Sequence, residues 1–290
     1  MELKGTVTAL VTPFRNGEPD YKSLRRLVNH QVSSGIDALL ACGCTGEPAV
    51  ISESGRIRVI ETVLEEAAGK VPVIAGTGTN CTASTVEFTE KVSRMGVDAV
   101  LVITPYYNKP TPEGQKVHYT RTADASEKPV IIYNVPGRTG TCMTIETLAA
   151  LGEHSNIIGV KDAAGSVERV TQLAKVSGIT YMSGDDHIAL PQVLMGASGV
   201  VSVTSNAAPA PMSRMINLGL AGRVHEARTI HKELYPLFKS LFIETNPAPV
   251  KKVLEMMGII ADGTPMEPLV PVSSETSDIL RSILHDLDLL

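Results

Sequence analysis

PVIIYNVPGRTGTCMTIETLAALGEHSNIIGVKD, residues 129–162, is the stretch that decides the fold. Two short apolar runs rich in β-branched residues, 129–135 and 157–162, flank a segment with helical spacing, 145–152. Strands that are nearly all apolar are typical of a parallel sheet covered on both faces. The pattern therefore predicts a strand–helix–strand unit with a parallel crossover.

The same rhythm extends in both directions along the chain. Further strands are predicted over residues 5–14, 37–43, 71–77, 98–104, 180–183 and 200–204. Helices are predicted over residues 21–34, 53–68, 82–95, 112–125, 167–176, 188–195 and 212–220. Asp20 and Ser52 are expected to cap the first two helices, and Gly35 and Gly69 to end them.

About eight strand–helix units with right-handed crossovers predict an α/β protein, a closed (β/α)₈ TIM barrel. We assign residues 1–222 to this barrel. Three further helical patterns, 224–244, 249–257 and 275–287, predict a small C-terminal helical extension over residues 223–290.

A doubly wound open sheet is the alternative fold. That fold places a GxGxxG fingerprint at the first strand–helix turn. The turn here is TPFRNGEPD, residues 12–20, which lacks it, and the glycines of residues 76–79 are those of a tight turn. The barrel is the better interpretation.

Composition excludes several classes of protein. The chain has 290 residues, of which 43% are hydrophobic and 20% charged, the balance of a soluble globular protein, and no apolar run approaches the roughly 20 residues of a membrane span. The N-terminus does not resemble a secretory signal. A net charge of −5 without a basic patch argues against nucleic acid as a partner.

The cysteines and histidines indicate neither disulfides nor a metal. The cysteines form no CxxC pair and read as reduced thiols of a cytoplasmic protein: Cys42, Cys44, Cys81 and Cys142. The histidines lack HExxH or other ligand spacing. Asp185-Asp186-His187 is interpreted as the cap of a helix and not as a metal site.

Barrel active sites lie at the C-terminal ends of the strands, so the polar residues there are the candidates. Lys161 stands in the otherwise apolar run IIGVKDA, with Gly159 beneath it on the same face, where a glycine would leave room. Burial should lower the pKa of this lysine, and a neutral amine is what Schiff-base chemistry requires. The alternative is a strand-end lysine that reaches solvent.

Two neighbours extend the candidate site. Tyr133, at a similar height on the preceding strand, could move protons during imine chemistry, or be a core tyrosine with a satisfied hydroxyl. Arg138 follows a Pro-Gly turn, and its guanidinium suits a carboxylate, although a loop arginine is often merely solvated.

Across essentially its whole length the chain resembles the dihydrodipicolinate synthases, a family of class I aldolases within the N-acetylneuraminate lyase superfamily. The motifs that carry the resemblance are TALVTPF, GCTGEP, VIAGTGTN, TPYYNKPTPEG, YNVPGRTG, GVKDAAG, SGDD, GVVSVTSN and NPAPVK. YNVPGRTG is the most specific, because its arginine marks the synthases over their sugar-acid lyase relatives.

The resemblance implies a role for each matching residue. Lys161 would form the imine with pyruvate, Tyr133 would relay protons, and Thr45 would bind the pyruvate carboxylate region and assist the relay. Arg138 would bind the carboxylate of L-aspartate-4-semialdehyde, and the backbone of Gly184 and Val201 would line the pocket.

The resemblance also implies how the enzyme works as a whole. It implies a lyase of diaminopimelate and lysine biosynthesis, without metal or organic cofactor, that forms a homotetramer of two tight dimers. Tyr107 would cross to the neighbouring subunit from a strained backbone. The alternatives are another pyruvate-dependent aldolase, such as a sugar-acid lyase, or a noncatalytic barrel.

Two departures from the family pattern stand out. Cys44 occupies the place of the threonine that joins two tyrosines in the relay, and a thiol is a weak donor and acceptor. The family's inhibitory lysine site is degenerate: it keeps Asn80 and Tyr106 beside Ala49. Pro48, Glu53, Arg56 and Ser84 replace the residues of lysine-sensitive members. The sequence predicts weakened but retained synthase activity and weak or absent inhibition by lysine.

Overall fold

The computed structural model describes residues 2–176 and 178–290. Its eight parallel strands form a closed barrel in the order β1-β10-β9-β8-β7-β6-β5-β4, which confirms the predicted (β/α)₈ fold. The strands are β1 (Gly5–Ala9), β4 (Ala38–Ala41), β5 (Val73–Gly76), β6 (Ala99–Ile103), β7 (Val130–Asn134), β8 (Ile157–Asp162), β9 (Thr180–Ser183) and β10 (Gly199–Ser202).

The helices follow the predicted alternation. They are α1 (Tyr21–Ser33), α2 (Glu53–Ala67), α3 (Thr82–Ser93), α4 (Pro112–Ala125), α5 (Pro136–Thr139), α6 (Ile145–Gly152), α7 (Glu168–Leu173), α8 (Asp186–Leu194), α9 (Pro209–Leu220), α10 (Val224–Ser240), α11 (Ala248–Met256) and α12 (Ser274–Asp286). Short 3₁₀ turns lie at η1 (Cys44–Gly46), η2 (Pro48–Val50) and η3 (Thr204–Asn206). These turns and α5 were not predicted.

The predicted helix ends are confirmed where a side chain or a glycine defines them. The carboxylate of Asp20 accepts hydrogen bonds from the backbone N–H groups of Lys22 and Ser23, and the hydroxyl of Ser52 accepts one from Gly55. Gly35 and Gly69 follow α1 and α2 with φ of +75° and +71°. Glycine adopts this left-handed conformation without steric cost, so both helices end there.

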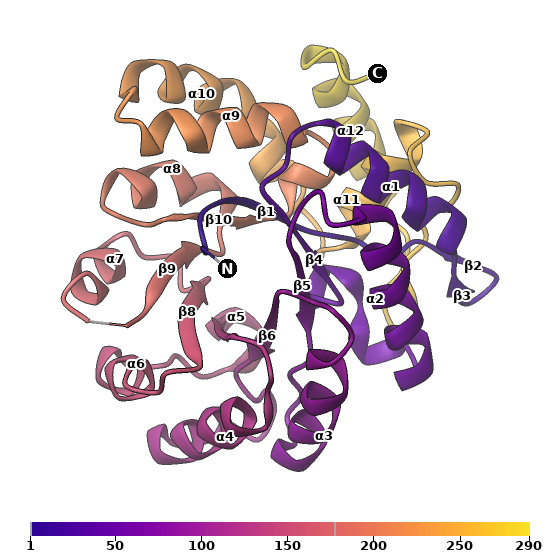
Figure 1. Cartoon of the computed structure of the whole chain (residues 1–290). Coiled ribbons are helices and arrows are strands. Elements are labelled where there is room, and N and C mark those ends of the chain that lie inside the picture. The colour runs from indigo at the N-terminus through magenta and orange to yellow at the C-terminus, as the bar shows by residue number, and fades with distance from the viewer. Residues whose placement is uncertain (1, 177) are drawn as a thin grey trace. The chain divides into compact units, whose positions relative to one another are not determined.

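One compact unit comprises Ile74–Val201 together with the N-terminal residues up to Gly5. In this unit α3, α4, α6, α7 and α8 flank strands β6 to β9 on their outer side (Figure 1). The register places Ile103 opposite Tyr133 and Tyr133 opposite Lys161, with an irregularity at Val130 and Ile131. The ends of β6, β7 and β8 are therefore adjacent.

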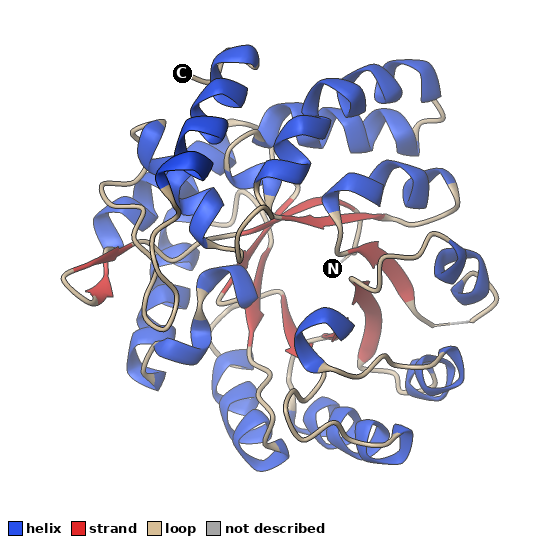
Figure 2. Cartoon of the chain, turned by 180° about the vertical axis from the view of Figure 1, so that it is seen from behind, coloured by secondary structure: helices blue, strands red, loops and turns tan. Residues whose placement is uncertain are grey.

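The other compact unit comprises Thr6–Val73 and Ser202–Leu290. Within it α1 packs on α2, α9 on α10, and α11 on α12. The strand predicted over residues 5–14 ends at Ala9 as β1, and the chain then forms an antiparallel pair, β2 (Phe14–Arg15) and β3 (Glu18–Pro19), at the left edge of Figure 2. Asn16 and Gly17, both with positive φ, form the turn of this hairpin. Where β1 ends, the side-chain amide of Asn206 donates to the backbone oxygen of Ala9 and accepts from the N–H of Val11, in place of a strand partner.

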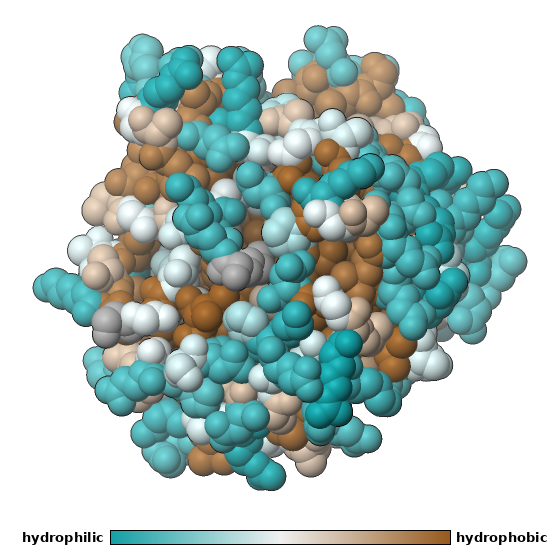
Figure 3. Space-filling view, viewed as in Figure 1, coloured by the Kyte–Doolittle hydropathy of each residue, from teal (hydrophilic) through white to brown (hydrophobic). Residues whose placement is uncertain are grey.

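Charged side chains cover the outer faces of α1 and α2, which are the hydrophilic surface at the right of Figure 3. Arg25 on α1 pairs with Glu66 on α2 at 2.5 Å, and Arg58 pairs with Glu61 at 3.2 Å. Pairs at the surface such as these, which are in contact with solvent, contribute little stability. In the described part of the chain no helix is long and apolar enough to cross a membrane. The predicted domain boundary after residue 222 stays a prediction.

Candidate active site

Lys161 and Tyr133 lie side by side at the ends of β8 and β7. They are register partners, and Nζ of Lys161 is 4.2 Å from the centroid of the Tyr133 ring. Both side chains are buried, with exposed fractions of 4% and 6%. A buried amine beside a phenol is an arrangement suited to imine chemistry with proton transfer.

Gly159 does not leave the empty space that the sequence suggested. A Cβ atom at this position would lie 2.7 Å from Cδ2 of Leu3 and 2.8 Å from the backbone oxygen of Thr180. The glycine instead lets Leu3 and strand β9 approach β8 closely. The prediction of room beneath Lys161 is therefore wrong, because the N-terminal segment fills it.

A buried polar network fixes the ends of β7 and β8 directly behind this pair. Asp162, which is fully buried, accepts hydrogen bonds from Nδ2 of Asn134 at 3.2 Å, from the backbone of Ala164 at 3.0 Å and from Nε of Arg169 at 2.8 Å. Arg169 also donates to the backbone oxygen of Met143. A buried carboxylate needs such partners. The only sequence signal for this network is an acidic residue at the end of the otherwise apolar run IIGVKD.

Gly184 and Asp185 follow β9 beside this network. The N–H of Gly184 donates to the backbone oxygen of Asp162 at 2.8 Å. A Cβ atom on Gly184 would lie 2.7 Å from the Cβ atom of Ala163. Asp185 occupies the N-cap position of α8, but its carboxylate accepts from the N–H of Gly165 and does not cap the helix, unlike the predicted helix cap. Burial raises the pKa of Asp185, and the positive charge of Lys161 is among the effects that oppose this shift.

Arg138 and Val201 have contrasting positions in the same unit. Arg138 is exposed on the short helix α5, which ends at Thr139 and is followed by Gly140 with φ of +70°. Val201 is a buried residue of β10. A guanidinium is a suitable partner for a carboxylate, because its N–H groups can bond both carboxylate oxygens.

Tyr107 lies in the loop after β6 and has the strained backbone that the resemblance implied. Its φ is +72°, a value that a tyrosine rarely adopts, and 88% of its surface is exposed. Asn108 donates to the backbone oxygen of Asn80 at 2.8 Å, which ties this loop to the loop before α3. The predicted residues Tyr106 and Asn80, both half-buried, thus lie in linked loops.

Cys44 and Thr45 lie in the other compact unit, in the 3₁₀ turn η1 after β4. Cys44 is half-buried, whereas Thr45 is 3% exposed and its hydroxyl accepts a hydrogen bond from Nδ2 of Asn246 at 3.1 Å. Ala49 is exposed on the following turn, η2.

Glu47, two residues after Thr45, forms a buried ion pair with Lys251 that the sequence did not indicate. Nζ of Lys251 on α11 donates to Oε1 of Glu47 at 2.8 Å and lies 4.2 Å from the centroid of the Phe14 ring. Burial lowers the pKa of Lys251, and the carboxylate of Glu47 opposes this shift. The sequence signal is a lysine among apolar residues of a helix, in the motif NPAPVK.

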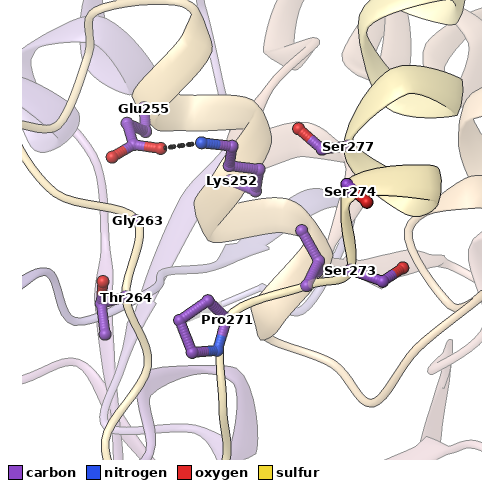
Figure 4. Close-up of a pocket in the computed structure, with 9 residues that line it drawn as sticks. Lys252, Glu255, Gly263, Thr264, Pro271, Ser273, Ser274 and Ser277 are labelled. Atoms are coloured by element: carbon purple, nitrogen blue, oxygen red, sulfur yellow. Dashed lines mark hydrogen bonds and ion pairs between the residues drawn. The ribbon is translucent and has the colours of Figure 1, made fainter.

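The same unit has a cavity of about 350 Å³ beside the start of α12. None of the predicted site residues lines it. Figure 4 shows Ser273, Ser274 and Ser277 on one side of it and the ion pair of Lys252 with Glu255 on another. In the described residues no group of three or more histidine, cysteine or acidic side chains could hold a metal ion.

Comparison with known proteins gives one consistent family. Residues 2–287 match the model of the dihydrodipicolinate synthetase family. The 4-hydroxy-tetrahydrodipicolinate synthase of Trichlorobacter lovleyi is 43% identical over 289 residues, 99% of each chain, and that of Persephonella marina is 42% identical over 290 residues, again 99% of each.

Solved structures agree with the sequence comparison. The dihydrodipicolinate synthase of Thermotoga maritima matches with a TM-score of 0.97 at 39% identity, over 99% of both chains. The chloride-inhibited dihydrodipicolinate synthase of Acinetobacter baumannii, solved in complex with pyruvate, also matches with a TM-score of 0.97 at 39% identity, over 100% of both chains.

Proposed function

The chain belongs to the dihydrodipicolinate synthetase family, and from this premise we propose that it is a 4-hydroxy-tetrahydrodipicolinate synthase of lysine and diaminopimelate biosynthesis. Its substrates would be pyruvate and L-aspartate-4-semialdehyde. The observation that carries the proposal is the buried amine of Lys161, 4.2 Å from the ring of Tyr133 at the ends of two neighbouring strands.

Lys161 starts the proposed reaction. Its neutral amine adds to the C2 carbonyl of pyruvate, and loss of water gives the imine. Removal of a proton from C3 converts the imine into an enamine, which attacks the aldehyde carbon of the second substrate. The amino group of that substrate then attacks C2, closes the ring and releases the lysine. No metal or organic cofactor is required in this scheme.

The other predicted residues take supporting roles in this proposal. Tyr133 passes protons between the imine and the second substrate, and Thr45 donates to the carboxylate of pyruvate. Arg138 holds the carboxylate of the aldehyde substrate, and the backbone of Gly184 and Val201 lines the pocket. Cys44 occupies the relay position between the tyrosines, where its weak hydrogen bonds would slow the transfer.

The assembly and location of the enzyme are part of the same proposal. A cytoplasmic homotetramer of two tight dimers would let Tyr107 of one subunit complete the site of its neighbour. The exposed ring of Tyr107 and its strained backbone support this role, since strain of this kind persists where function requires it.

Borohydride trapping tests the imine directly. The protein is incubated with pyruvate and reduced, and intact mass and peptide mapping are expected to place one reduced pyruvyl group on Lys161. Lys161→Ala should carry no adduct, whereas Lys232→Ala, which removes an exposed lysine of α10, should be labelled like the wild type. A wild-type protein without an adduct would contradict the proposal.

A coupled assay with pyruvate and aspartate semialdehyde tests the second half-reaction. The wild type is expected to turn over both substrates, and activity on N-acetylneuraminate in their place would indicate a sugar-acid lyase instead.

A further inference from the structure

Three side chains hold the turn of residues 45–47 in place. The hydroxyl of Thr12 donates to the oxygen of Gly46 at 2.8 Å, Nζ of Lys251 donates to Glu47 at 2.8 Å, and Nδ2 of Asn246 donates to the hydroxyl of Thr45 at 3.1 Å. Two of these donors, Asn246 and Lys251, belong to the C-terminal extension. The extension therefore contacts each side of the turn that presents Thr45.

The ion pair fixes the backbone of the turn at Glu47. This residue has left-handed backbone angles, φ 54° and ψ 43°, which a glutamate rarely adopts. Its carboxylate is engaged on both oxygens, since Oε1 accepts from Lys251 and Oε2 accepts from the N–H of Met266 at 2.9 Å. Lys251 is fully buried. A buried ion pair seldom adds net stability. A better reason for its presence is that it fixes the conformation of the turn at Glu47.

Asn246 determines how the hydroxyl of Thr45 can be used. Both residues are buried, with exposed fractions of 5% and 3%. Because the amide nitrogen can only donate, the hydroxyl must accept in this bond, and its own hydrogen is then directed to another acceptor. A carboxylate is an acceptor without a proton to give, and it matches a hydroxyl prepared in this way.

We propose that Asn246, Glu47 and Lys251 are positioning residues for Thr45, which hold its turn and orient its hydroxyl as a donor to the carboxylate of pyruvate. This inference rests on the proposed function, which assigns the carboxylate to Thr45. It gives the C-terminal extension a part in substrate binding that is indirect and acts through Thr45.

Asn246→Asp and Asn246→Ala test the proposal in the full-length protein. In the first variant the hydroxyl of Thr45 has to donate to the new carboxylate, and in the second the orienting donor is lost without added charge. The measurement is the pyruvate concentration at half-maximal borohydride trapping. We expect it to rise about tenfold or more for Asp and several-fold for Ala, the range of one lost hydrogen bond to a charged group. The KM for aspartate semialdehyde should change less than about twofold.

Asn217→Asp is the matched control. Asn217 also donates through Nδ2 to a hydroxyl, that of Ser213 at 3.3 Å, but it is exposed on α9, and its variant should trap pyruvate like the wild type. If the pyruvate concentration at half-maximal trapping is unchanged in both Asn246 variants, the inference is overturned. It is also overturned if this concentration rises for Asn246→Asp alone, because the added charge would then explain the effect.

Thermal unfolding shows whether each variant is folded, and if the Asp variant is not, the Ala variant decides alone. A wild type that traps no pyruvate overturns the proposed function together with this inference. Normal trapping in the wild type and unchanged trapping in both Asn246 variants overturns the inference only.

Discussion

Cys44 lies half-buried at the start of a 3₁₀ turn, at the position where the resemblance implies a hydroxyl in the proton relay. Replacing the thiol by threonine restores a stronger donor and acceptor at nearly the same volume. We expect Cys44→Thr to raise kcat with pyruvate and aspartate semialdehyde several-fold, within the range of general acid–base effects. The coupled assay at saturating substrates measures this change.

The control for this substitution is Cys81→Ser, which alters an exposed thiol in the other compact unit and should leave kcat as it is. If Cys44→Thr left the rate unchanged or lowered it, the relay would not be limited by the thiol.

Lysine inhibition is a second property set by single residues. By the resemblance, Ser84, exposed on α3, would stand where lysine-sensitive members carry a glutamate, and Arg56 adds a positive charge to α2. Without the carboxylate an ammonium ligand loses its partner. We expect little or no inhibition in a lysine titration of the coupled assay, and measurable inhibition after Ser84→Glu. Strong inhibition of the wild type by sub-millimolar lysine would contradict this prediction.

How far the sequence predicts single residues depends on whether their partners are close along the chain. Lys161 is recognisable because a charged residue interrupts an apolar strand, and Tyr107 because a motif marks it. Asp162 and Arg169 lie only seven positions apart, yet neither residue type nor their spacing indicates the bond between them. Glu47 and Lys251, which are 204 positions apart, have no local signal of pairing.

At the scale of elements, the ion pair of Glu47 and Lys251 joins helix α11 to the turns after β4. Their side chains are 4% and 0% exposed. Lys251→Met leaves an unpaired buried carboxylate, and we expect the free energy of unfolding to fall by about 3–5 kcal/mol. The double variant Lys251→Met with Glu47→Gln removes both charges and should recover most of this loss. Urea unfolding at a fixed protein concentration measures both.

Lys252→Met is the matched control on the same helix. Lys252 is 34% exposed and pairs with Glu255 at 2.6 Å, so its loss should cost no more than about 1 kcal/mol. Equal losses for Lys251→Met and Lys252→Met would show that burial of the first pair does not matter.

The sequence predicted four elements at their exact bounds, and a clear start and stop signal defines them better than the strength of their period does. Helices α4 and α6 and strands β8 and β9 begin and end at the predicted residues. The 3₁₀ turns η1 and η3 and the short helix α5 are too short to show a period, and tertiary hydrogen bonds such as that of Thr12 with Gly46 hold them. The turns near the candidate site were therefore the least predictable part of the fold.

At the scale of the whole molecule, the barrel was predictable because the same strand–helix signal repeats about eight times. One misplaced boundary, such as the early end of β1 at Ala9, leaves that count unchanged. The candidate site is different, because its residues come from distant parts of the sequence and only the family motifs connect them. Lys161 and Tyr133 are adjacent through the register of β7 and β8, which a single strand does not reveal.

Assembly is the property of the whole molecule that the exposed ring of Tyr107 addresses. The side chain of Tyr107 is 88% exposed in the single chain, and its backbone is strained, at φ +72°. A ring that is exposed in this way is available to the site of a neighbouring subunit. If two subunits exchange this residue, Lys161→Ala and Tyr107→Phe should complement each other. A mixed dimer then contains one site with both residues intact, because a two-fold interface exchanges them reciprocally.

The experiment unfolds and refolds the two inactive variants together at equal concentrations. Half of the dimers are then mixed, and we expect about a quarter of the wild-type activity, whereas each variant refolded alone stays near its own low activity. Lys161→Ala refolded with wild type provides the control for refolding yield. If the mixture is no more active than the sum of its parts, Tyr107 acts within its own chain or not at all, and the exposed ring needs another explanation.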